Sequence, residues 1–169
     1  IYDLLKNESE KVYLEKDYDD FYIPRIKWTQ DPEILSAQYI NRHQNELDLW
    51  LFNANGYDSA IILTEKSDTY VDVTDDITFL DDNSFIWTSE KDGHNHIYYY
   101  SSSGNLLNQV TRGAWDVTKF YGYDKKTKKV FYQSVENGSI NRDVYSISLN
   151  GLNKTRLSKK TGTNKATFS

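Results

Sequence analysis

An internal repeat with a period of about 47 residues constrains the fold of this 169-residue chain more than any other feature. Three segments align on a glycine, at Gly56, Gly104 and Gly151, and these glycines lie 48 and 47 residues apart. A short apolar stretch follows each glycine and ends in a hydroxyl residue, at Thr64, Thr111 and Ser158. A repeat of this length is typical of a β-propeller, in which each unit is a four-stranded blade.

The composition and the turn residues agree with strands. Aromatic residues make up 15% of the chain and there are two prolines, a composition that favours strands. Strands are expected at residues 34–39, 84–89 and 129–134, ahead of the three aligned segments. Asn-Gly and Asp-Gly pairs between the apolar runs are typical of tight hairpins. We therefore predict an all-β fold, a partial β-propeller of about three and a half four-stranded blades.

The repeat also predicts where the blades begin and end. Residues 1–20 are expected to close a preceding blade with strands at 1–4 and 11–14. Complete blades are expected at 22–64, 70–111 and 115–158, and residues 165–169 would begin another, with a strand at 166–168. A closed four-bladed ring would need the terminal strands to share one blade and would still lack a strand. With no methionine and a start at Ile1, we expect an excerpt of a larger propeller.

Several motifs in this register point to one family. They are YIPRIKW at 22–28, YINRHQNELDL at 39–49, FLDDNSFIWTSEKDGHNHIY at 79–98 and VTRGAWDVT at 110–118. The chain resembles the N-terminal propeller region of bacterial dipeptidyl peptidase IV-like serine peptidases, in the prolyl oligopeptidase family. This resemblance implies an eight-bladed propeller that caps a C-terminal α/β-hydrolase domain. It also implies enzymes that release X-Pro or X-Ala dipeptides.

The resemblance assigns this chain a role without catalysis. No Gly-x-Ser-x-Gly motif occurs, so the nucleophile elbow of the hydrolase domain is absent, and so is the family's Glu-Glu pair. The family loop that corresponds to residues 71–78 borders the substrate cavity, but here it lacks the aromatic residue and the arginine of some members. We therefore assign no catalytic, substrate-binding or metal residue and no cofactor. The expected partners are a hydrolase domain and, through the full-length enzyme, a peptide substrate; the expected location is periplasmic or extracytoplasmic.

One cluster has the residue types of a metal site. His94 and His96 lie two residues apart, which on a strand places both imidazoles on one face, and Asp92 is a conceivable third ligand. The alternative is that His94 lies in a hairpin loop. His96 would then occupy the position that Asp48 and Asp143 hold in the other repeats, where a polar side chain bonds a turn or a neighbouring strand.

Other polar residues have a functional and a structural interpretation. The acidic pairs at 19–20, 75–76 and 81–82 could serve acid–base chemistry or lie solvated in turns. His43 lies in a polar hairpin tip at 41–45. Arg25 could bind a carboxylate in a bidentate manner or form an ion pair between blades. Asn-x-Ser/Thr matches occur at Asn7, Asn137 and Asn153, and they bear glycans only in a secreted eukaryotic protein.

Charge and composition exclude some classes of function. Residues 1–118 hold 9 Lys/Arg against 22 Asp/Glu, a balance of −13, and residues 119–169 hold 11 against 3, a balance of +8. Because the lysines of the basic third flank turns, we predict no nucleic-acid partner. No apolar run is long enough for a membrane helix, and zero cysteines exclude disulfides. An open arc would expose strand edges, so we expect self-association. A non-enzymatic propeller that binds proteins is the alternative function.

Overall fold

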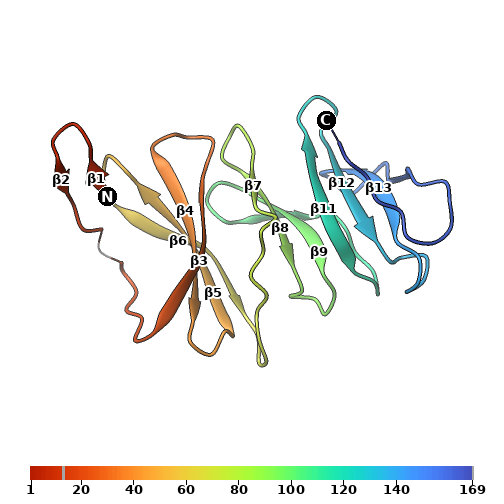
Figure 1. The fold of residues 1–169 in the computed structure, drawn as a ribbon, viewed down its shortest axis with the longest axis horizontal. Coiled ribbons are helices and arrows are strands. Elements are labelled where there is room, and N and C mark those ends of the chain that lie inside the picture. The colour runs from red at the N-terminus through yellow and green to blue at the C-terminus, as the bar shows by residue number, and fades with distance from the viewer. Residues whose placement is uncertain (13, 169) are drawn as a thin grey trace. The chain divides into compact units, whose positions relative to one another are not determined.

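The computed structural model describes residues 1–12 and 14–168, and every regular element in these residues is a β-strand (Figure 1). Within this described part, no helix has the length and hydropathy needed to cross a membrane. The chain divides into two compact units. The first contains Ile1–Asp75 and Phe79–Asn83, and the second contains Asp76–Thr78 and Ser84–Ser169. The predicted all-β fold class is confirmed.

The first unit contains a small hairpin and one four-stranded antiparallel sheet. In the hairpin, β1 (Tyr2–Asp3) pairs with β2 (Glu8–Ser9). The sheet follows chain order, β3-β4-β5-β6. Its strands are β3 (Phe21–Trp28), β4 (Ile34–Asn41), β5 (Glu46–Asn53) and β6 (Ser59–Lys66).

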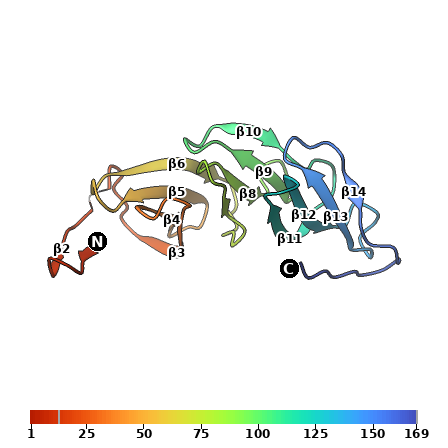
Figure 2. The same ribbon diagram turned by 90° about the horizontal axis from the view of Figure 1, so that it is seen from above.

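Two further four-stranded sheets follow. One has the order β10-β9-β8-β7, built from β7 (Thr78–Phe79), β8 (Phe85–Ser89), β9 (His96–Tyr100) and β10 (Leu106–Gln109). The other has the order β11-β12-β13-β14, built from β11 (Val117–Asp124), β12 (Lys129–Ser134), β13 (Asp143–Ser148) and β14 (Thr155–Arg156). Figure 2 shows β9 between β8 and β10 in the second unit. Each sheet is a meander whose strands pair in chain order, as expected for a propeller blade.

The cores are built from the two central strands of each sheet. In the first unit, Trp50 on β5 is fully buried and pairs with Ala37 on β4. Trp87 on β8 and Tyr132 on β12 are likewise fully buried. Because neighbours in a strand point to opposite faces, both faces of a blade must be covered, and large aromatic side chains fill that space.

The repeated hydroxyl residue forms the same contact in all three sheets. It bonds the polar residue at the equivalent position of the third strand: Thr64 Oγ1 to Asp48 (2.5 Å), Thr111 Oγ1 to His96 (3.1 Å) and Ser158 Oγ to Asp143 (2.7 Å). Asp48, His96 and Asp143 are each almost fully buried. The contact therefore ties the segment after the third strand back to that strand, which explains why both landmarks keep the 47-residue register.

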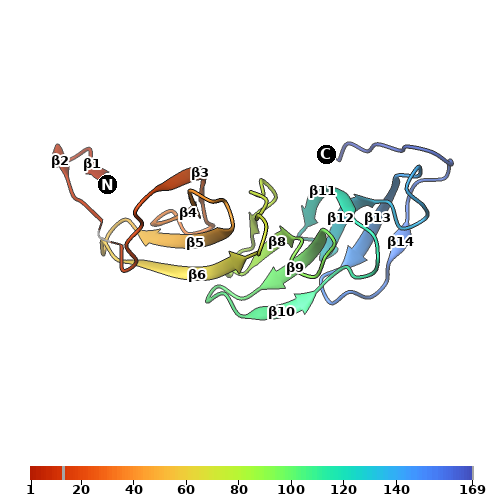
Figure 3. The same cartoon turned by 90° about the horizontal axis from the view of Figure 1, so that it is seen from below.

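Two expected strands at the chain ends differ from the structure. The second strand of the first hairpin is β2 and not residues 11–14, of which residue 13 lies outside the described part. The backbone amides of Leu5 and Lys6 both donate to Asp3 Oδ1, so the chain turns back at once and Tyr2 pairs with Ser9. Residues 166–168 form no strand; Figure 3 shows this segment as irregular chain. Phe168 instead packs its ring on Phe131, with centroids 4.5 Å apart.

Candidate functional site

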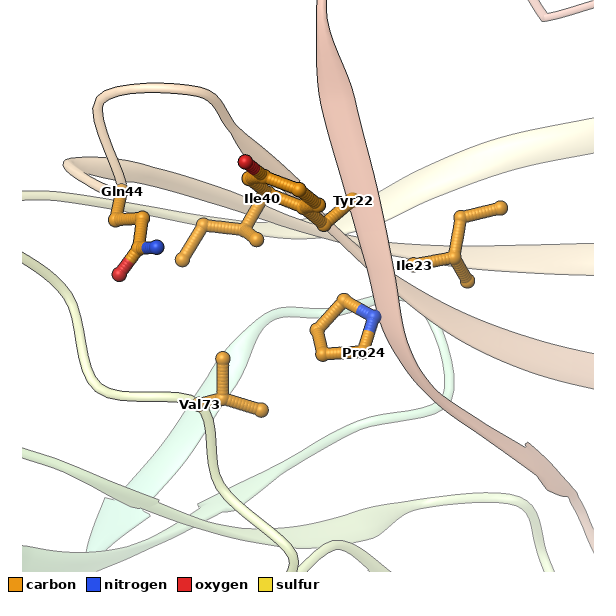
Figure 4. A pocket seen from close by; sticks show the side chains of 6 residues that line it. All are labelled: Tyr22, Ile23, Pro24, Ile40, Gln44 and Val73. Carbon is orange, nitrogen blue, oxygen red and sulfur yellow. The ribbon is translucent and has the colours of Figure 1, made fainter.

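A largely apolar pocket of about 430 Å³ lies in the first unit. It is lined by the β3 residues Tyr22, Ile23 and Pro24, by Ile40 and Gln44, and by Val73 from the segment after β6. Figure 4 shows these six side chains around one opening. The pocket lies where the pairing of β3 with β4 shifts register, between Tyr22 and Arg25.

The segment that closes one side of the pocket is attached to the sheet at several points. The Val71 amide donates to the Gln44 carbonyl oxygen (2.8 Å). The Gln38 side chain, on β4, donates from Nε2 to the Thr74 carbonyl oxygen (2.7 Å). We call residues 73–75 the strap. It lies within the 71–78 loop to which the sequence assigned no binding role.

Arg25 and Asp75 form an ion pair at the edge of this site. The guanidinium donates through Nε and Nη2 to the two carboxylate oxygens of Asp75, in a bidentate arrangement. These hydrogen bonds hold the pKa of Asp75 below its usual range. The structural interpretation of Arg25 as an ion-pair residue is therefore the one found here, with both partners in the first unit. Both side chains remain largely exposed, so the pair contributes little to stability.

The two histidines that suggested a metal site have separate structural partners. His94 Nδ1 lies 3.2 Å from Asp116 Oδ1, and the ring is partly exposed. His96 has no exposed surface; Nδ1 faces Thr111 Oγ1 and Nε2 bonds the Gly113 carbonyl oxygen (2.9 Å). Among the described residues, no group of three or more His, Cys, Asp or Glu is arranged to hold a metal ion. His96 thus occupies the position that Asp48 and Asp143 hold in the other sheets.

The contact between His96 and Thr111 pairs an imidazole with a hydroxyl, as in a nucleophile and its base. It differs from a catalytic pair in access, because both side chains are buried. Thr111 Oγ1 also accepts the Ile97 amide (2.9 Å), so the hydroxyl is held between the strand backbone and the His96 ring. This geometry stabilises the sheet and does not present a nucleophile to substrate.

Several of the remaining predicted candidates have structural contacts of their own. Asp20 pairs loosely with Arg42 at 3.7 Å, and Asp75 is the carboxylate that Arg25 binds. His43 is exposed in the β4–β5 turn, in which Asn41 Oδ1 accepts the Asn45 amide. Asp20 and Asp75 each pair with an arginine, so neither is arranged as one of two carboxylates that act together in acid–base catalysis.

The three Asn-x-Ser/Thr positions differ in their contacts. Asn7 and Asn153 lie in turns with φ of 57° and 56°. The Asn137 side chain donates to Asp143 Oδ2 (3.0 Å) and to the Tyr145 hydroxyl (2.8 Å). A substituent on Asn137 would therefore displace two internal hydrogen bonds.

Neither the polar role of Gln38 nor the pocket was predicted from the sequence. A signal was present, since Gln38 and Gln133 lie 95 residues apart, close to two repeats. Gln133 Nε2 likewise donates to a backbone carbonyl of a later segment, that of Asn164 (2.5 Å). A polar residue that recurs at the same strand position in two repeats indicates a structural hydrogen bond. The sequence does not show which group is the partner in that hydrogen bond.

Comparison with known proteins gives one consistent result. Residues 1–169 match the family model described as the dipeptidyl peptidase IV (DPP IV) N-terminal region. The crystal structure of Porphyromonas gingivalis dipeptidyl peptidase 4 superposes with a TM-score of 0.91 at 38% identity, covering 99% of this chain and 24% of that one.

Curated relatives are more distant in sequence. A probable dipeptidyl-aminopeptidase B of Pyrenophora teres is 27% identical over 180 residues, covering 95% of this chain and 20% of the relative. Mouse inactive dipeptidyl peptidase 10 is 26% identical over 144 residues, covering 79% and 18%. The chain thus spans about a fifth of the length of these relatives. With the whole-chain family match and the shared fold, the chain belongs to the N-terminal region of the dipeptidyl peptidase IV family and is a partial β-propeller.

Proposed function

We propose that this chain forms part of the cap and access cavity of a serine-type dipeptidyl peptidase, whose nucleophile, base and oxyanion donors lie in a C-terminal α/β-hydrolase domain. The observation that carries this proposal is the match of the entire chain, at a TM-score of 0.91, to dipeptidyl peptidase 4 of P. gingivalis. Full-length activity on X-Pro or X-Ala peptides is part of the proposal. The role of this segment is to restrict and recognise the peptides that enter.

The geometry of the described residues supports a role without catalysis. The buried His96–Thr111 pair cannot contact substrate, and His94 and His43 lie in turns. The pocket beside the strap offers an apolar, open surface of the kind that contacts peptide side chains. We also propose a periplasmic or extracytoplasmic location, testable by cell fractionation, and self-association of the isolated chain.

Activity measurements test the enzyme proposal. A longer protein that contains this segment is expected to release the chromophore from a Gly-Pro anilide, and a serine-directed fluorophosphonate should abolish that release. This chain alone should release none. Absence of turnover in a folded longer protein would contradict the proposal. Such a result would favour the alternative function, a non-enzymatic propeller that binds proteins. The similarity of this chain to mouse inactive dipeptidyl peptidase 10 supports that alternative.

A further inference from the structure

Two equivalent glutamines differ in one hydrogen bond. Gln133, on β12, donates from Nε2 to the Asn164 carbonyl oxygen and accepts at Oε1 from the Thr118 hydroxyl (2.7 Å). Gln38, on β4, donates from Nε2 to the Thr74 carbonyl oxygen in the same way. Its Oε1 is buried and has no hydrogen-bond partner. Gln38 is 2% exposed, so water does not reach this acceptor in the structure.

The difference follows from one residue in the first strand of each sheet. Lys119 pairs with Gln133, and the residue before Lys119 is Thr118, which supplies the hydroxyl. Arg25 pairs with Gln38, and the residue before Arg25 is Pro24. Proline has neither a backbone N–H nor a side-chain donor. The residue of β3 that corresponds to Thr118 therefore cannot donate to Gln38 Oε1.

This unpartnered acceptor lies beside the apolar pocket. Gln38 and Ile40 are two residues apart on β4, so their side chains share a face, and Ile40 lines the pocket. The amide of Gln38 reaches Thr74, the residue after Val73, which also lines the pocket. Pro24 lines it from the other side. The strap covers the Gln38 amide.

The strap has one contact that is exposed, the Arg25–Asp75 pair, and one that is buried, the hydrogen bond from Gln38 to Thr74. The Arg25–Asp75 pair is exposed to solvent and exchanges readily with water. Displacing residues 73–75 breaks the hydrogen bond from Gln38 Nε2 to Thr74. It also uncovers Gln38 Oε1, and a buried acceptor of this kind costs free energy as long as it has no partner. A donor that enters from the pocket can then bond Gln38 Oε1.

We propose that the pocket and the Gln38 amide form a binding subsite for an extended peptide segment, which is admitted by displacement of the strap. An apolar peptide side chain occupies the space among Tyr22, Pro24 and Ile40, and the backbone N–H next to it donates to Gln38 Oε1. A backbone amide meets the requirement because a peptide presents an N–H donor next to each side chain. This inference rests on the proposed function, in which peptides pass this surface.

Titration of blocked peptides into the purified chain tests the subsite. The probe is acetyl-Ala-Leu-Ala-amide, and the matched control carries N-methyl-leucine, which keeps the side chain but removes the donor. Binding is followed by NMR shifts of backbone amides. We expect shifts of the amides of residues 22, 23, 25 and 73–75, and at least about fivefold weaker binding of the N-methyl peptide, the loss of one net hydrogen bond.

A substitution separates this role from simple surface contact. Pro24→Thr places a hydroxyl where Thr118 stands beside Gln133, so that Gln38 Oε1 is satisfied internally. We expect this variant to bind the parent peptide and the N-methyl peptide with equal affinity, because the acceptor that distinguishes the two peptides is already satisfied. Circular dichroism and the urea midpoint establish whether the variant is folded. If the variant does not fold, the affinities of the parent and N-methyl peptides for the unmodified chain still test the inference.

Two outcomes overturn the inference. One is equal affinity of the parent and N-methyl peptides for the unmodified chain, and the other is shifts that avoid residues 22, 23, 25 and 73–75. Neither outcome affects the Gly-Pro anilide test of the longer protein. A failed subsite and a failed enzyme proposal are therefore distinguishable.

Discussion

Asp143 is a buried carboxylate surrounded by hydrogen-bond donors. Asn137 Nδ2, Ser158 Oγ and Arg156 Nη2 donate to its oxygens at 3.0, 2.7 and 2.7 Å. Burial alone would raise the pKa of Asp143, but the donors outweigh burial and hold the pKa below its usual range. Asp143 is therefore ionised at neutral pH and links β13 to the segments on both sides.

The lowered pKa makes stability depend on pH with a definite sign. Because the unfolded chain binds the proton more readily, the contribution of Asp143 is present above the unfolded pKa of about 3.9 and is lost as pH falls through the lower folded value. Asp143→Asn should reduce the free energy of unfolding by about 2–3 kcal/mol at pH 7, measured by urea denaturation. The difference from the unmodified chain should narrow below about pH 4.

Asp19→Asn is the matched control, because Asp19 is exposed. It should change stability by less than about 0.5 kcal/mol. A difference between Asp143→Asn and the unmodified chain that stays constant down to the acid transition would contradict the assignment of the low pKa to Asp143.

At the scale of elements, the turn between β13 and β14 packs against the end of β10. Asn108 Nδ2 donates to the Leu149 carbonyl oxygen (2.8 Å). Gly151 in this turn has φ of 78°, and a Cβ there would lie 3.3 Å from the Val110 carbonyl oxygen. The glycine of the repeat is thus needed here both for its backbone conformation and for close approach to the neighbouring sheet.

Two glycine substitutions separate these requirements. Gly93 has φ of 94° with nothing within 4 Å of its Cβ position, so Gly93→Ala should cost about 1 kcal/mol, from backbone strain alone. Gly151→Ala should cost about 2–3 kcal/mol, because the Val110 carbonyl must also shift. Urea midpoints measure both, and equal losses would show that the contact with Val110 has no effect.

At the scale of the whole molecule, the outer strand of the sheet in the first unit carries exposed apolar side chains. The edge strand β3 is exposed at almost every position, with Ile26 67% and Trp28 55% exposed. A long apolar edge strand offers unpaired backbone groups to another chain. The bulge and Pro24 interrupt the first half of β3, so its second half is the site where we expect pairing.

Light scattering across a wide concentration range tests this expectation. The purified chain should increase in average mass with concentration, and Ile26→Lys should suppress the increase by placing a charge on the edge. Ile140→Lys is the control, since Ile140 is 82% exposed in a loop away from a strand edge, and it should behave like the unmodified chain. A constant monomeric mass of the unmodified chain would contradict self-association through β3.

Much of the fold could be predicted from the sequence because it depends on local chemistry. Alternating apolar residues and Asn-Gly or Asp-Gly turns predicted strands at 34–39, 84–89 and 129–134, which correspond to β4, β8 and β12. The repeat also placed His96 in the position of Asp48 and Asp143. The strand expected at 1–4 contains β1, but its partner is β2 because a turn set by Asp3 brings Ser9 opposite Tyr2, and residues 166–168 form no strand.

The sequence by itself determined the all-β class, because strand alternation and turn residues depend on neighbours a few positions away. The repetition of these local signals determined the 47-residue unit, and the quoted motifs carried the family resemblance. Only the tertiary structure decided that Arg25 binds Asp75, 50 residues away, and that Gln38 lacks a partner where Gln133 has one. Those facts depend on a bulge in β3 and on which residue stands beside the glutamine across the sheet. Strand register decides such contacts, and register is a property of the paired strands and not of either strand alone.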